Sequence, residues 1–510
     1  MSFAEIRLKK IFDSPLCEIH EGVSYNFYDV KLAQFSEIEQ KFANLLIRLL
    51  QRSGSFLEFS SYDLPDGFSD AFKGELITFV ESNGLVDRVP SNREFILVLE
   101  VLARLVSNIS FISNKTDFCE YVLQNAIGLK QLAFFSLDDD LEELMINGPE
   151  KIFVFHKKFG MCKLNISLDE KSILVLIKRI AFSSGRPFDS KNPILDTRLP
   201  DGSRVNAVLG NLSKFGLSLT VRKFSQVPLT VLDLIENRTI SSELAAFLWV
   251  MVDGGGNFQK NILIVGGAAS GKTTLLNVLS NFSRLHERVV SIEDTLEISL
   301  LSRDNWVALE SKNSADDEIT MDDLLKNSLR MRPDRIIVGE VRGKEALTLF
   351  TAMDNGHTGC LGTIHANNSR EAVVKLQERP FLVPSTMIPL VDLIIVIQRF
   401  YSKELGIKRR VTEISEVSRM DNKVLLGNIY DFDETLDQAK RTEVPSRIMD
   451  VLSNQLLVSK IDLKKEIDTR KLILEWMIKK DIRKPNEVLE FIQTYYYRPD
   501  KVLQMIKSNK

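Results

Sequence analysis

Cysteine is scarce in this sequence, which contains four such residues among its 510. They lie far apart and no two of them form a CxxC pair: Cys17, Cys119, Cys162 and Cys360. Four cysteines spread over the chain in this way suggest neither a disulfide framework nor a tetracysteine zinc site. The five histidines have no ligand-like spacing either, which argues against a zinc centre. This composition suits a reducing compartment.

An excess of one charge and long hydrophobic runs are also absent. The 66 Lys and Arg residues against 69 Asp and Glu give a net charge of −3, which argues against nucleic acid as a partner. The most apolar stretch begins at Phe95, but Glu100 and Arg104 interrupt it and it is too short to span a bilayer. The first residues lack the apolar core of a secretory signal. We therefore expect a cytoplasmic chain with membrane contact that is peripheral at most.

The sequence does contain enough apolar material for several cores. Hydrophobic residues make up 44% of the chain and charged residues 26%, as in globular proteins. A chain of 510 residues exceeds the size of a single core, so we expect several units. Changes of pattern predict four of them: a helical N-terminal region (1–130), a small α/β domain (131–228), a larger α/β domain (229–435) and a C-terminal helical region (436–510).

Changes of apolar periodicity define these boundaries. Apolar residues recur at three- and four-residue spacing in residues 35–52 and 92–108, as in amphipathic helices. Strand-like segments flank a polar turn at residues 156–160, as in a hairpin. Beyond the linker at Pro228, short apolar runs alternate with helices, which is typical of a parallel sheet covered on both faces: NILIV, VVSI, RIIV, CLGTI and DLIIVI. The segments RRVTEISEVS and KVLLGNIYDF then predict an antiparallel pair.

The strongest local motif is GGAASGKTT, which satisfies the phosphate-loop pattern G-x-x-x-x-G-K-[ST]. A predicted strand precedes it and a predicted helix follows it, and this order lets backbone N–H groups and the helix N-terminus face phosphates. We expect Lys272 to contact the β- and γ-phosphates and Thr273 to bind Mg²⁺. The predicted nucleotide-binding residues are Gly266, Gly267, Ala268, Ala269, Ser270, Gly271, Lys272, Thr273 and Thr274.

Acidic residues follow two of the predicted strands. Glu293 and Asp294 come after VVSI, and Glu340 comes after RIIVG. Because ligands bind beyond the carboxyl ends of parallel strands, these carboxylates should converge on the phosphates, where a water must be activated and Mg²⁺ held. His365 ends another apolar run and is a candidate contact on the γ-phosphate side. A purely structural histidine is the alternative for His365, as it is for His357.

Four ordered segments together closely resemble the type II/IV secretion ATPase superfamily, whose members are hexameric motors of type IV pili, archaella, and type II and type IV secretion. The segments are GGAASGKTT, SIEDTLEI, SLRMRPDRIIVGEVRG and GHTGCLGTIHANN. The resemblance extends through LMINGP, LDTRLPDGSRVNAVL, TVRKF and RRVTEISEV, and so covers about residues 140–430. It implies an α/β fold in which a RecA-like P-loop motor domain is preceded by a smaller α/β domain and a helical N-terminal region.

The resemblance also implies roles for individual residues. Glu340 occupies the position whose glutamate polarises the attacking water, Glu293 and Asp294 lie in an acidic box, and His365 lies in a histidine box. Mg²⁺ is expected on Thr273, Glu293 and Asp294. The catalytic set is Glu340, Glu293, Lys272, Arg204, Arg222 and His365.

The arginines in this set belong to the smaller α/β domain. Arg204 and Arg222 match arginines that the family brings to the nucleotide, where a guanidinium fork suits the γ-phosphoryl oxygens. The alternative is that they form interdomain salt bridges only. Arg330, Arg332 and Arg342 are further candidates at a subunit boundary.

The resemblance implies a cytoplasmic ATPase that uses ATP and Mg²⁺. The sequence lacks the tetracysteine zinc module that several bacterial relatives contain, and its segment LPDGSRVNAV resembles the archaeal branch of the superfamily. The expected function is therefore to drive assembly or rotation of an archaeal type IV filament, an archaellum or a pilus. The expected partners are five further copies in a homohexamer, a polytopic membrane platform protein, and other filament or secretion machinery proteins. The alternatives are the motor of a type II/IV secretion channel that exports protein or DNA, a RecA-like nucleic-acid translocase, and a nucleotide-gated scaffold.

Overall fold

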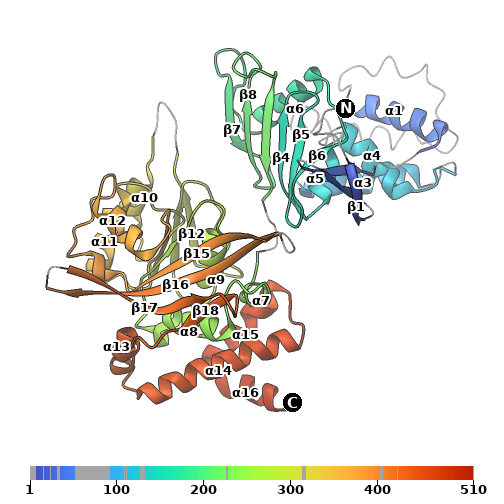
Figure 1. Ribbon diagram of the computed structural model, residues 1–510. Helices are drawn as coiled ribbons and strands as arrows, with labels where there is room; N and C mark the ends of the chain where they lie inside the picture. The colour runs from blue at the N-terminus through green and yellow to red at the C-terminus, as the bar shows by residue number, and fades with distance from the viewer. Residues whose placement is uncertain are drawn as a thin grey trace. The chain divides into compact units, whose positions relative to one another are not determined.

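The computed structural model describes residues 7–14, 16–22, 25–31, 35–51, 92–107, 109–110, 112–126, 132–224, 228–312, 318–402, 406–421 and 423–508. The chain divides into two units, Met1–Ser225 and Gln226–Lys510. The division lies within three residues of the predicted linker at Pro228. Each unit is built around its own nine-stranded sheet, and each is described by itself (Figure 1).

The sheet of the first unit has the order β1-β2-β3-β6-β5-β4-β9-β8-β7. All neighbours are antiparallel except β3 and β6, which are parallel. The predicted hairpin around residues 156–160 is confirmed as β5 and β6. The strands are β1 (Arg7–Asp13), β2 (Cys17–Gly22), β3 (Asn26–Val30), β4 (Leu141–Asn147), β5 (Ile152–His156), β6 (Gly160–Leu164), β7 (Ile194–Arg198), β8 (Arg204–Val208) and β9 (Ser218–Arg222).

The prediction of a helical region over residues 1–130 is wrong for its first thirty residues. Strands β1, β2 and β3 lie there, and β3 joins them to β6 of the small α/β domain. These strands are five to seven residues long, and β2 reads CEIHEG. Strands this short and this polar carry too few apolar alternations to be recognised, because their stability comes from pairing with a distant segment.

Helices of the first unit form two packing groups. Helices α1 (Glu37–Gln51), α3 (Asn92–Val106) and α4 (Lys115–Ala126) share a core of their own around Leu46, Leu102 and Phe118. The short α5 (Ala133–Leu137) and α6 (Glu170–Ser183) instead pack against the sheet. Helix α6 begins where Asp169 accepts a hydrogen bond from the Ser172 amide, which satisfies a free helix-end donor.

The sheet of the second unit has the order β12-β11-β13-β14-β10-β15-β16-β17-β18. From β12 to β15 all neighbours are parallel, and from β15 to β18 they are antiparallel. The five predicted parallel strands and the antiparallel pair are confirmed, whereas β12 and β18 were not predicted. The strands are β10 (Ile262–Val265), β11 (Val289–Glu293), β12 (Trp306–Glu310), β13 (Arg335–Val338), β14 (Leu361–Ile364), β15 (Leu393–Ser402), β16 (Gly406–Met420), β17 (Lys423–Asp433) and β18 (Gln438–Arg441).

Helices cover both faces of this sheet, as Figure 1 shows. Ile262 and Ile264 of β10 pack into one core with α8, α9 and the C-terminal helices, while Leu263 and Val265 pack into the other with α10, α11 and α12. Burial on both faces explains the uninterrupted apolar runs. The helices are α7 (Val231–Glu236), α8 (Ser242–Asp253), α9 (Lys272–Ser280), α10 (Met321–Ser328), α11 (Glu345–Asp354), α12 (Ser369–Gln377), α13 (Arg447–Leu456), α14 (Lys460–Lys479), α15 (Pro485–Tyr497) and α16 (Pro499–Ser508), with 3₁₀ turns at Gly254–Gly256 and Ile388–Leu390.

The C-terminal helices belong to the core of the second unit. Ile467 and Leu474 of α14 lie in the same buried cluster as Trp249 of α8 and Leu275 of α9. The region predicted as helical at 436–510 begins with strand β18 and is helical from Arg447, and its helices pack on the sheet of the second unit. Among the residues that the structure describes, no helix combines the length and apolar character needed to cross a bilayer.

Candidate nucleotide-binding site

The phosphate loop connects β10 to α9, in the predicted order of strand, loop and helix. Gly271 has φ +97° directly before the helix, a conformation that glycine adopts without steric cost. Gly266 leaves no room for a side chain, because a Cβ there would lie 2.3 Å from the carbonyl oxygen of Ile397. The loop is thus tightly folded against β15, at the carboxyl edge of the parallel strands.

Lys272 is buried and folds back over its own loop. Its Nζ lies 3.1 Å from the Gly266 carbonyl oxygen, 2.9 Å from that of Gly267, and 3.3 Å from Nδ1 of His365. Burial lowers the pKa of this ammonium, and nearby Arg342 acts in the same direction, while Glu340 opposes them. The Lys272 ammonium is therefore a buried positive charge whose hydrogen bonds go to neutral carbonyl oxygens. A phosphate is a stronger acceptor and would replace these carbonyl oxygens.

Ser270 supplies a second indication that the loop is built for a ligand. Its hydroxyl is buried, with 2% of the residue exposed, and has no hydrogen-bond partner within the described part of the chain. A buried hydroxyl without a partner costs free energy. Because the loop otherwise packs tightly, phosphate oxygens are a fitting acceptor for this donor.

Glu340 and His365 meet beside the loop, as the sequence predicts. Glu340 follows β13 and His365 follows β14, and their Oε1 and Nε2 atoms lie 2.9 Å apart. Arg342 Nη2 donates to Glu340 Oε2 at 2.6 Å, and its Nη1 lies 3.4 Å from Asp294 Oδ2. Lys272, Glu340, His365, Asp294 and Arg342 thus form one cluster at the carboxyl edge of the sheet.

The ionisation of this cluster favours a carboxylate next to a neutral imidazole. Burial raises the pKa of Glu340, but the Arg342 hydrogen bond and the surrounding positive charges outweigh it, so the net shift is downward. For His365, burial and the charge of Lys272 lower the pKa from its ordinary value of 6.5. At neutral pH a water beside Glu340 would therefore face an ionised carboxylate, which is the state that a general base requires.

Glu293 differs from the other predicted acids. Only 2% of it is exposed, and its Oε2 accepts hydrogen bonds from the amides of Glu297 and Ile298 at 2.7 and 2.9 Å. Its Cγ lies 2.8 Å from where a Cβ on Gly339 would stand, so it packs against the segment that leads to Glu340. Its contacts fix the loop that carries Asp294, whereas its catalytic and metal-binding role stays a prediction.

A magnesium ion suits the groups around the loop. The Thr273 hydroxyl belongs to the first turn of α9. The Asp294 carboxylate is 40% exposed and accepts hydrogen bonds from Ser311 Oγ at 2.8 Å and from Arg342 Nη1 at 3.4 Å. Among the described residues no cluster of three or more His, Cys, Asp or Glu side chains is arranged for a metal ion. Mg²⁺ takes one or two protein oxygens and completes its shell with substrate phosphates and water, so the oxygens of Thr273 and Asp294 are of the kind that it binds.

Arg204 and Arg222 lie side by side in the first unit. They are opposite each other in the register of β8 and β9, so their side chains share one face of the sheet. Arg198 of β7 is opposite Arg204 in turn, and Glu143 of β4 is opposite Arg222. The sequence predicted Arg204 and Arg222 as site residues. It did not predict Arg198, because only the pairing of β7 with β8 shows that Arg198 lies next to Arg204.

Of the three further arginine candidates, one lies in the site. Arg342 contacts Glu340, as described above, whereas Arg330 and Arg332 precede the amino end of β13, at the opposite edge of the sheet from Glu340. Arg409 of β16, which the sequence did not single out, donates from Nε to the Ala269 carbonyl oxygen at 3.2 Å. This contact between Arg409 and the phosphate loop depends on the pairing of β10, β15 and β16, so it cannot be recognised from the local sequence.

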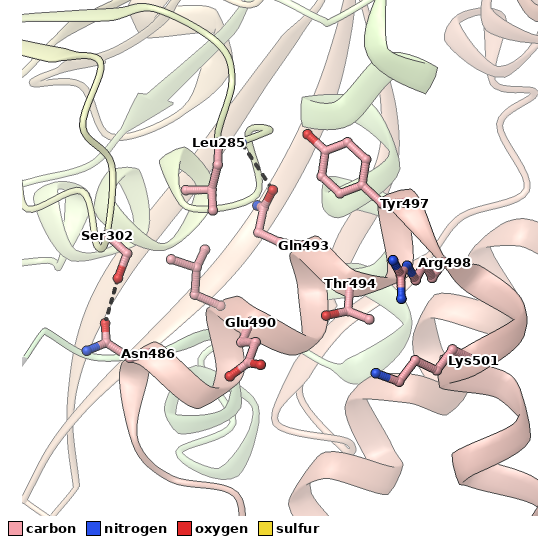
Figure 2. A pocket seen from close by; sticks show the side chains of 10 residues that line it. Leu285, Ser302, Asn486, Glu490, Gln493, Thr494, Tyr497, Arg498 and Lys501 are labelled. Atoms are coloured by element: carbon pink, nitrogen blue, oxygen red, sulfur yellow. Dashed lines mark hydrogen bonds between the residues drawn. The ribbon is translucent and has the colours of Figure 1, made fainter.

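A cavity of about 580 Å³ lies at the other end of the unit. Figure 2 shows it between α15 and the segments at Leu285 and Ser302, where the Leu285 amide donates to Gln493 Oε1 at 3.1 Å. Its lining includes no residue of the phosphate loop and none of the cluster around Glu340. The candidate nucleotide site is therefore the cluster at the carboxyl edge of the sheet and not this cavity.

Comparison with known proteins assigns the chain to a family. The sequence profile of the family described as "Type II/IV secretion system protein" matches residues 131–425, which is more than half of the chain. The chain belongs to this family. The match covers both the small α/β domain and the parallel sheet with its phosphate loop, so the α/β fold with a smaller domain before the phosphate-loop domain is confirmed.

Three relatives place this type II/IV secretion family member among known sequences. It is 50% identical to MJ0781 of Methanocaldococcus jannaschii over 246 residues, 47% of this chain and 34% of that protein. It is 34% identical to MJ0900 of the same organism over 395 residues, 74% of this chain and 69% of that protein. It is also 32% identical to the probable conjugal transfer protein TrbB of Sinorhizobium fredii over 312 residues, 59% and 90% of the two chains. The chain thus spans about a third of the length of MJ0781.

Proposed function

We propose that this protein is an ATP-hydrolysing motor that drives assembly or rotation of an archaeal type IV filament, an archaellum or a pilus, through a polytopic membrane platform protein. The observation that carries the ATPase part is the convergence of Glu340, His365 and Arg342 beside a complete phosphate loop. Membership of the type II/IV secretion family supports a role in a membrane-bound transport machine. The identity with MJ0900, an archaeal protein, supports the archaeal setting.

The chemistry follows from the contacts of Glu340. In this structure Arg342 donates a hydrogen bond to Oε2 of Glu340, and Nε2 of His365 lies 2.9 Å from Oε1. A γ-phosphate bound over Lys272 attracts the Arg342 guanidinium, 60% of whose side chain is exposed. Glu340 is then released to accept a proton from the water that attacks the γ-phosphate, and His365 keeps the carboxylate oriented.

Thr273 and Asp294 are the residues that would hold magnesium. When bound, Mg²⁺ neutralises charge that develops on the β- and γ-phosphate oxygens. Asp294 is positioned for this by Ser311 and by the loop that Glu293 fixes. Glu293, the third predicted metal contact, acts through that loop.

Arg204 and Arg222 supply further positive charge to the triphosphate in this proposal. Arg204 and Arg222 are directly opposite each other on neighbouring strands, and two adjacent guanidinium groups offer several donors to phosphate oxygens. Their approach when ATP binds and their release after hydrolysis would convert the reaction into a domain movement. A homohexamer at the inner face of the cytoplasmic membrane would transmit it to the platform protein and to other filament machinery proteins.

The test is ATP hydrolysis by the purified full chain, with a platform protein in lipid as the added partner and Glu340→Gln as the control. The proposal predicts turnover that rises with the platform protein and vanishes in the variant. Turnover that ignores the platform protein but rises with DNA would instead favour a nucleic-acid translocase.

A second candidate is the motor of a type II/IV secretion channel that exports protein or DNA. The identity with TrbB, whose name describes a conjugal transfer protein, favours it. The site chemistry is the same for both functions, so the membrane partner separates them. Stimulation by a secretion-channel component, and not by a filament platform, would establish this candidate.

A further inference from the structure

The hairpin of β15 and β16 extends past the sheet edge beside the phosphate loop. Val396 of β15 is opposite Val265, the last residue of β10, and β15 continues from there to Ser402. At about 3.3 Å per residue this continuation is roughly 20 Å long. The long β15 and β16 ribbons are visible in Figure 1. The loop thus has a two-stranded wall on the side opposite Glu340, because Glu340 and His365 follow β13 and β14 on the other side of β10.

Three cross-strand pairs follow one another along one face of this hairpin. Side chains that are opposite in an antiparallel pair share a face, and the same face recurs every second residue. The pairs, from the core outward, are Ile397 with Val411, Arg399 with Arg409, and Tyr401 with Ile407. The first pair is buried in the core that contains α9, so the next two pairs continue the same face outward.

Contacts show that this face is the one turned to the phosphate loop. Arg409 Nε donates to the Ala269 carbonyl oxygen at 3.2 Å. A Cβ on Gly271 would lie 3.1 Å from Arg409 Cδ and 3.5 Å from Ile397 Cδ1. The arginine pair therefore stands directly beside the loop, and Tyr401 stands one pair farther out.

The two arginines form a like-charge pair. In the described part of the chain neither of them makes an ion pair with a carboxylate, whereas neighbouring Arg410 is paired with Asp437 at 2.7 Å. Like charges directly opposite each other on neighbouring strands are destabilising. A bound anion would remove this cost, and phosphate is the anion that the adjacent loop is built to hold.

The outermost pair is suited to an aromatic ligand. Tyr401 is 78% exposed, and Ile407 beside it is partly exposed. A flat aromatic surface next to cations is the arrangement on which nucleic-acid bases stack. We propose that this face of the β15–β16 hairpin binds the nucleoside half of ATP: Tyr401 stacks on the purine, and Arg399 and Arg409 bind the α-phosphate and ribose side.

This inference rests on the proposed ATPase function and deepens it by assigning the base-binding surface. The test is calorimetric titration of the full chain with magnesium and either ATP or inorganic tripolyphosphate, which lacks base and ribose. Tyr401→Ala should lower ATP affinity about tenfold, the size of one base–aromatic stacking contact, and leave tripolyphosphate affinity within about twofold. Tyr401→Phe should retain ATP affinity, and Arg409→Gln should lower the affinity of both ligands.

Matched controls lie at the other end of the same ribbon. Arg419 and Met420 end β16 and are exposed, Met420 to 65%. Arg419→Gln and Met420→Ala should leave both affinities unchanged. ATP binding that Tyr401→Ala does not change, or that it lowers together with tripolyphosphate binding, would overturn the inference while the ATPase proposal stands. A wild-type chain that binds neither ligand would overturn both.

Discussion

Charged side chains lie at both edges of the second unit's sheet, but their burial and their hydrogen-bond partners differ between the two edges. At the amino edge, Arg335 is 1% exposed and directs three of its donors to Glu287 Oε2, the Gly359 carbonyl oxygen and the Val252 carbonyl oxygen, at 2.8 to 3.0 Å. At the carboxyl edge, Arg342 is 60% exposed and its nearest acids, Glu340 and Asp294, lie in loops after strands. The charges at the amino edge find their partners within the protein, whereas the exposed charges at the carboxyl edge are available to a ligand.

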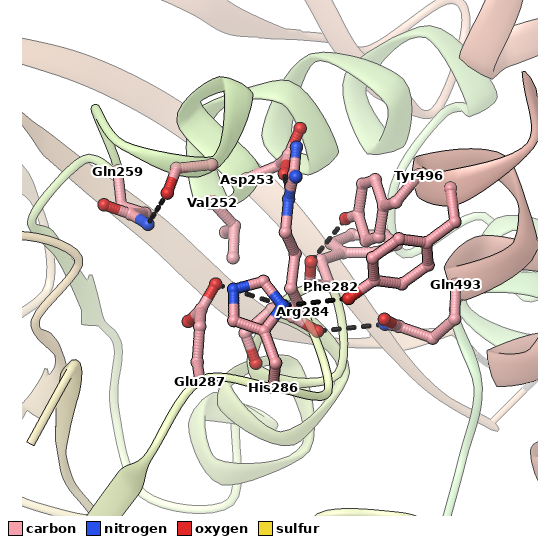
Figure 3. A network of polar contacts seen from close by, with 12 residues as sticks. Val252, Asp253, Gln259, Phe282, Arg284, His286, Glu287, Gln493 and Tyr496 are labelled. Atoms are coloured by element: carbon pink, nitrogen blue, oxygen red, sulfur yellow. Dashed lines mark hydrogen bonds and ion pairs between the residues drawn. The ribbon is translucent and has the colours of Figure 1, made fainter.

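Figure 3 shows how far the amino-edge network extends. Asp253, at the end of α8, accepts from Arg284 Nε and from Arg470 Nη2, both at 2.8 Å, so it joins the loop after α9 to the C-terminal helix α14. Arg303 adds four donor contacts to backbone and hydroxyl oxygens of the same loop. Buried charges with all these partners hold elements together. At the carboxyl edge, by contrast, solvent-accessible groups with shifted pKa values lie beside a loop whose hydrogen-bonding groups are not all partnered. This combination is typical of a reaction site.

The largest effect should come from Glu340→Gln. The amide cannot accept a proton from water, so kcat should fall by a factor of about 10² to 10⁴. The affinity for ATP should stay within a few-fold, since Lys272 and the loop are intact. Steady-state hydrolysis together with calorimetric binding measures both quantities. Residual turnover near the wild-type rate would show that another group activates the water.

A matched pair of arginine substitutions tests the comparison of the two edges. Arg335→Met leaves Glu287 buried without its partner and should lower the free energy of unfolding by about 3 to 5 kcal/mol. Arg342→Met removes an exposed ion pair and should cost less than about 1 kcal/mol.

Urea unfolding of both variants measures this difference, and hydrolysis should show the reverse order. Arg342→Met should impair turnover, whereas the folded Arg335→Met should turn over ATP as the wild type does. Equal destabilisation by the two substitutions would contradict the distinction between the edges.

The pH profile depends on His365. Because burial and Lys272 lower its pKa below 6.5, the imidazole is neutral at pH 7 and protonates only in more acidic solution. An imidazolium 2.9 Å from Glu340 would pair with the general base. We therefore expect the acid limb of kcat/KM to have its midpoint below pH 6.5, and His365→Gln to move it further down. A midpoint above 6.5, or one that the variant leaves in place, would rule out this role.

The smallest effect should come from Ser270→Ala. The hydroxyl has no partner in the described part of the chain, so its removal should leave the free energy of unfolding unchanged or slightly raised. ATP affinity should fall about fivefold, which corresponds to one lost hydrogen bond of about 1 kcal/mol. A large stability loss in Ser270→Ala would mean that the hydroxyl has a structural role.

Much of the second unit could be predicted from sequence because its signals are local. The runs of β10, β13 and β14 are apolar on both faces, and the phosphate loop is a contiguous motif that contains Gly266, Gly271 and Lys272. Acids at the ends of β11 and β13 were found because parallel strands end at one edge. The sequence did not reveal that backbone amides hold Glu293, since that depends on how the following loop folds back.

The remaining features depend on long-range pairing. Strand β3 pairs with β6 across more than 130 positions, and neither segment encodes its partner. Arg409 lies beside Ala269 only because β16 pairs with β15, which pairs with β10. The stripe of α14 that contains Ile467 and Leu474 is visible in the sequence, but its burial under α8 is set by tertiary packing.

In this proposal ATP binds at the carboxyl edge of the second unit's sheet, whereas the amino edge only stabilises the fold. Urea unfolding of the wild type, Lys272→Ala and Arg335→Met, each with and without magnesium and ATP, tests it most directly. At one hundred times its dissociation constant, ATP should add about 2.7 kcal/mol to the free energy of unfolding of the wild type and of Arg335→Met. It should add nothing to Lys272→Ala. An undiminished gain in Lys272→Ala would show that ATP binds away from the phosphate loop, and loss of the gain in Arg335→Met would show that the amino edge takes part in binding.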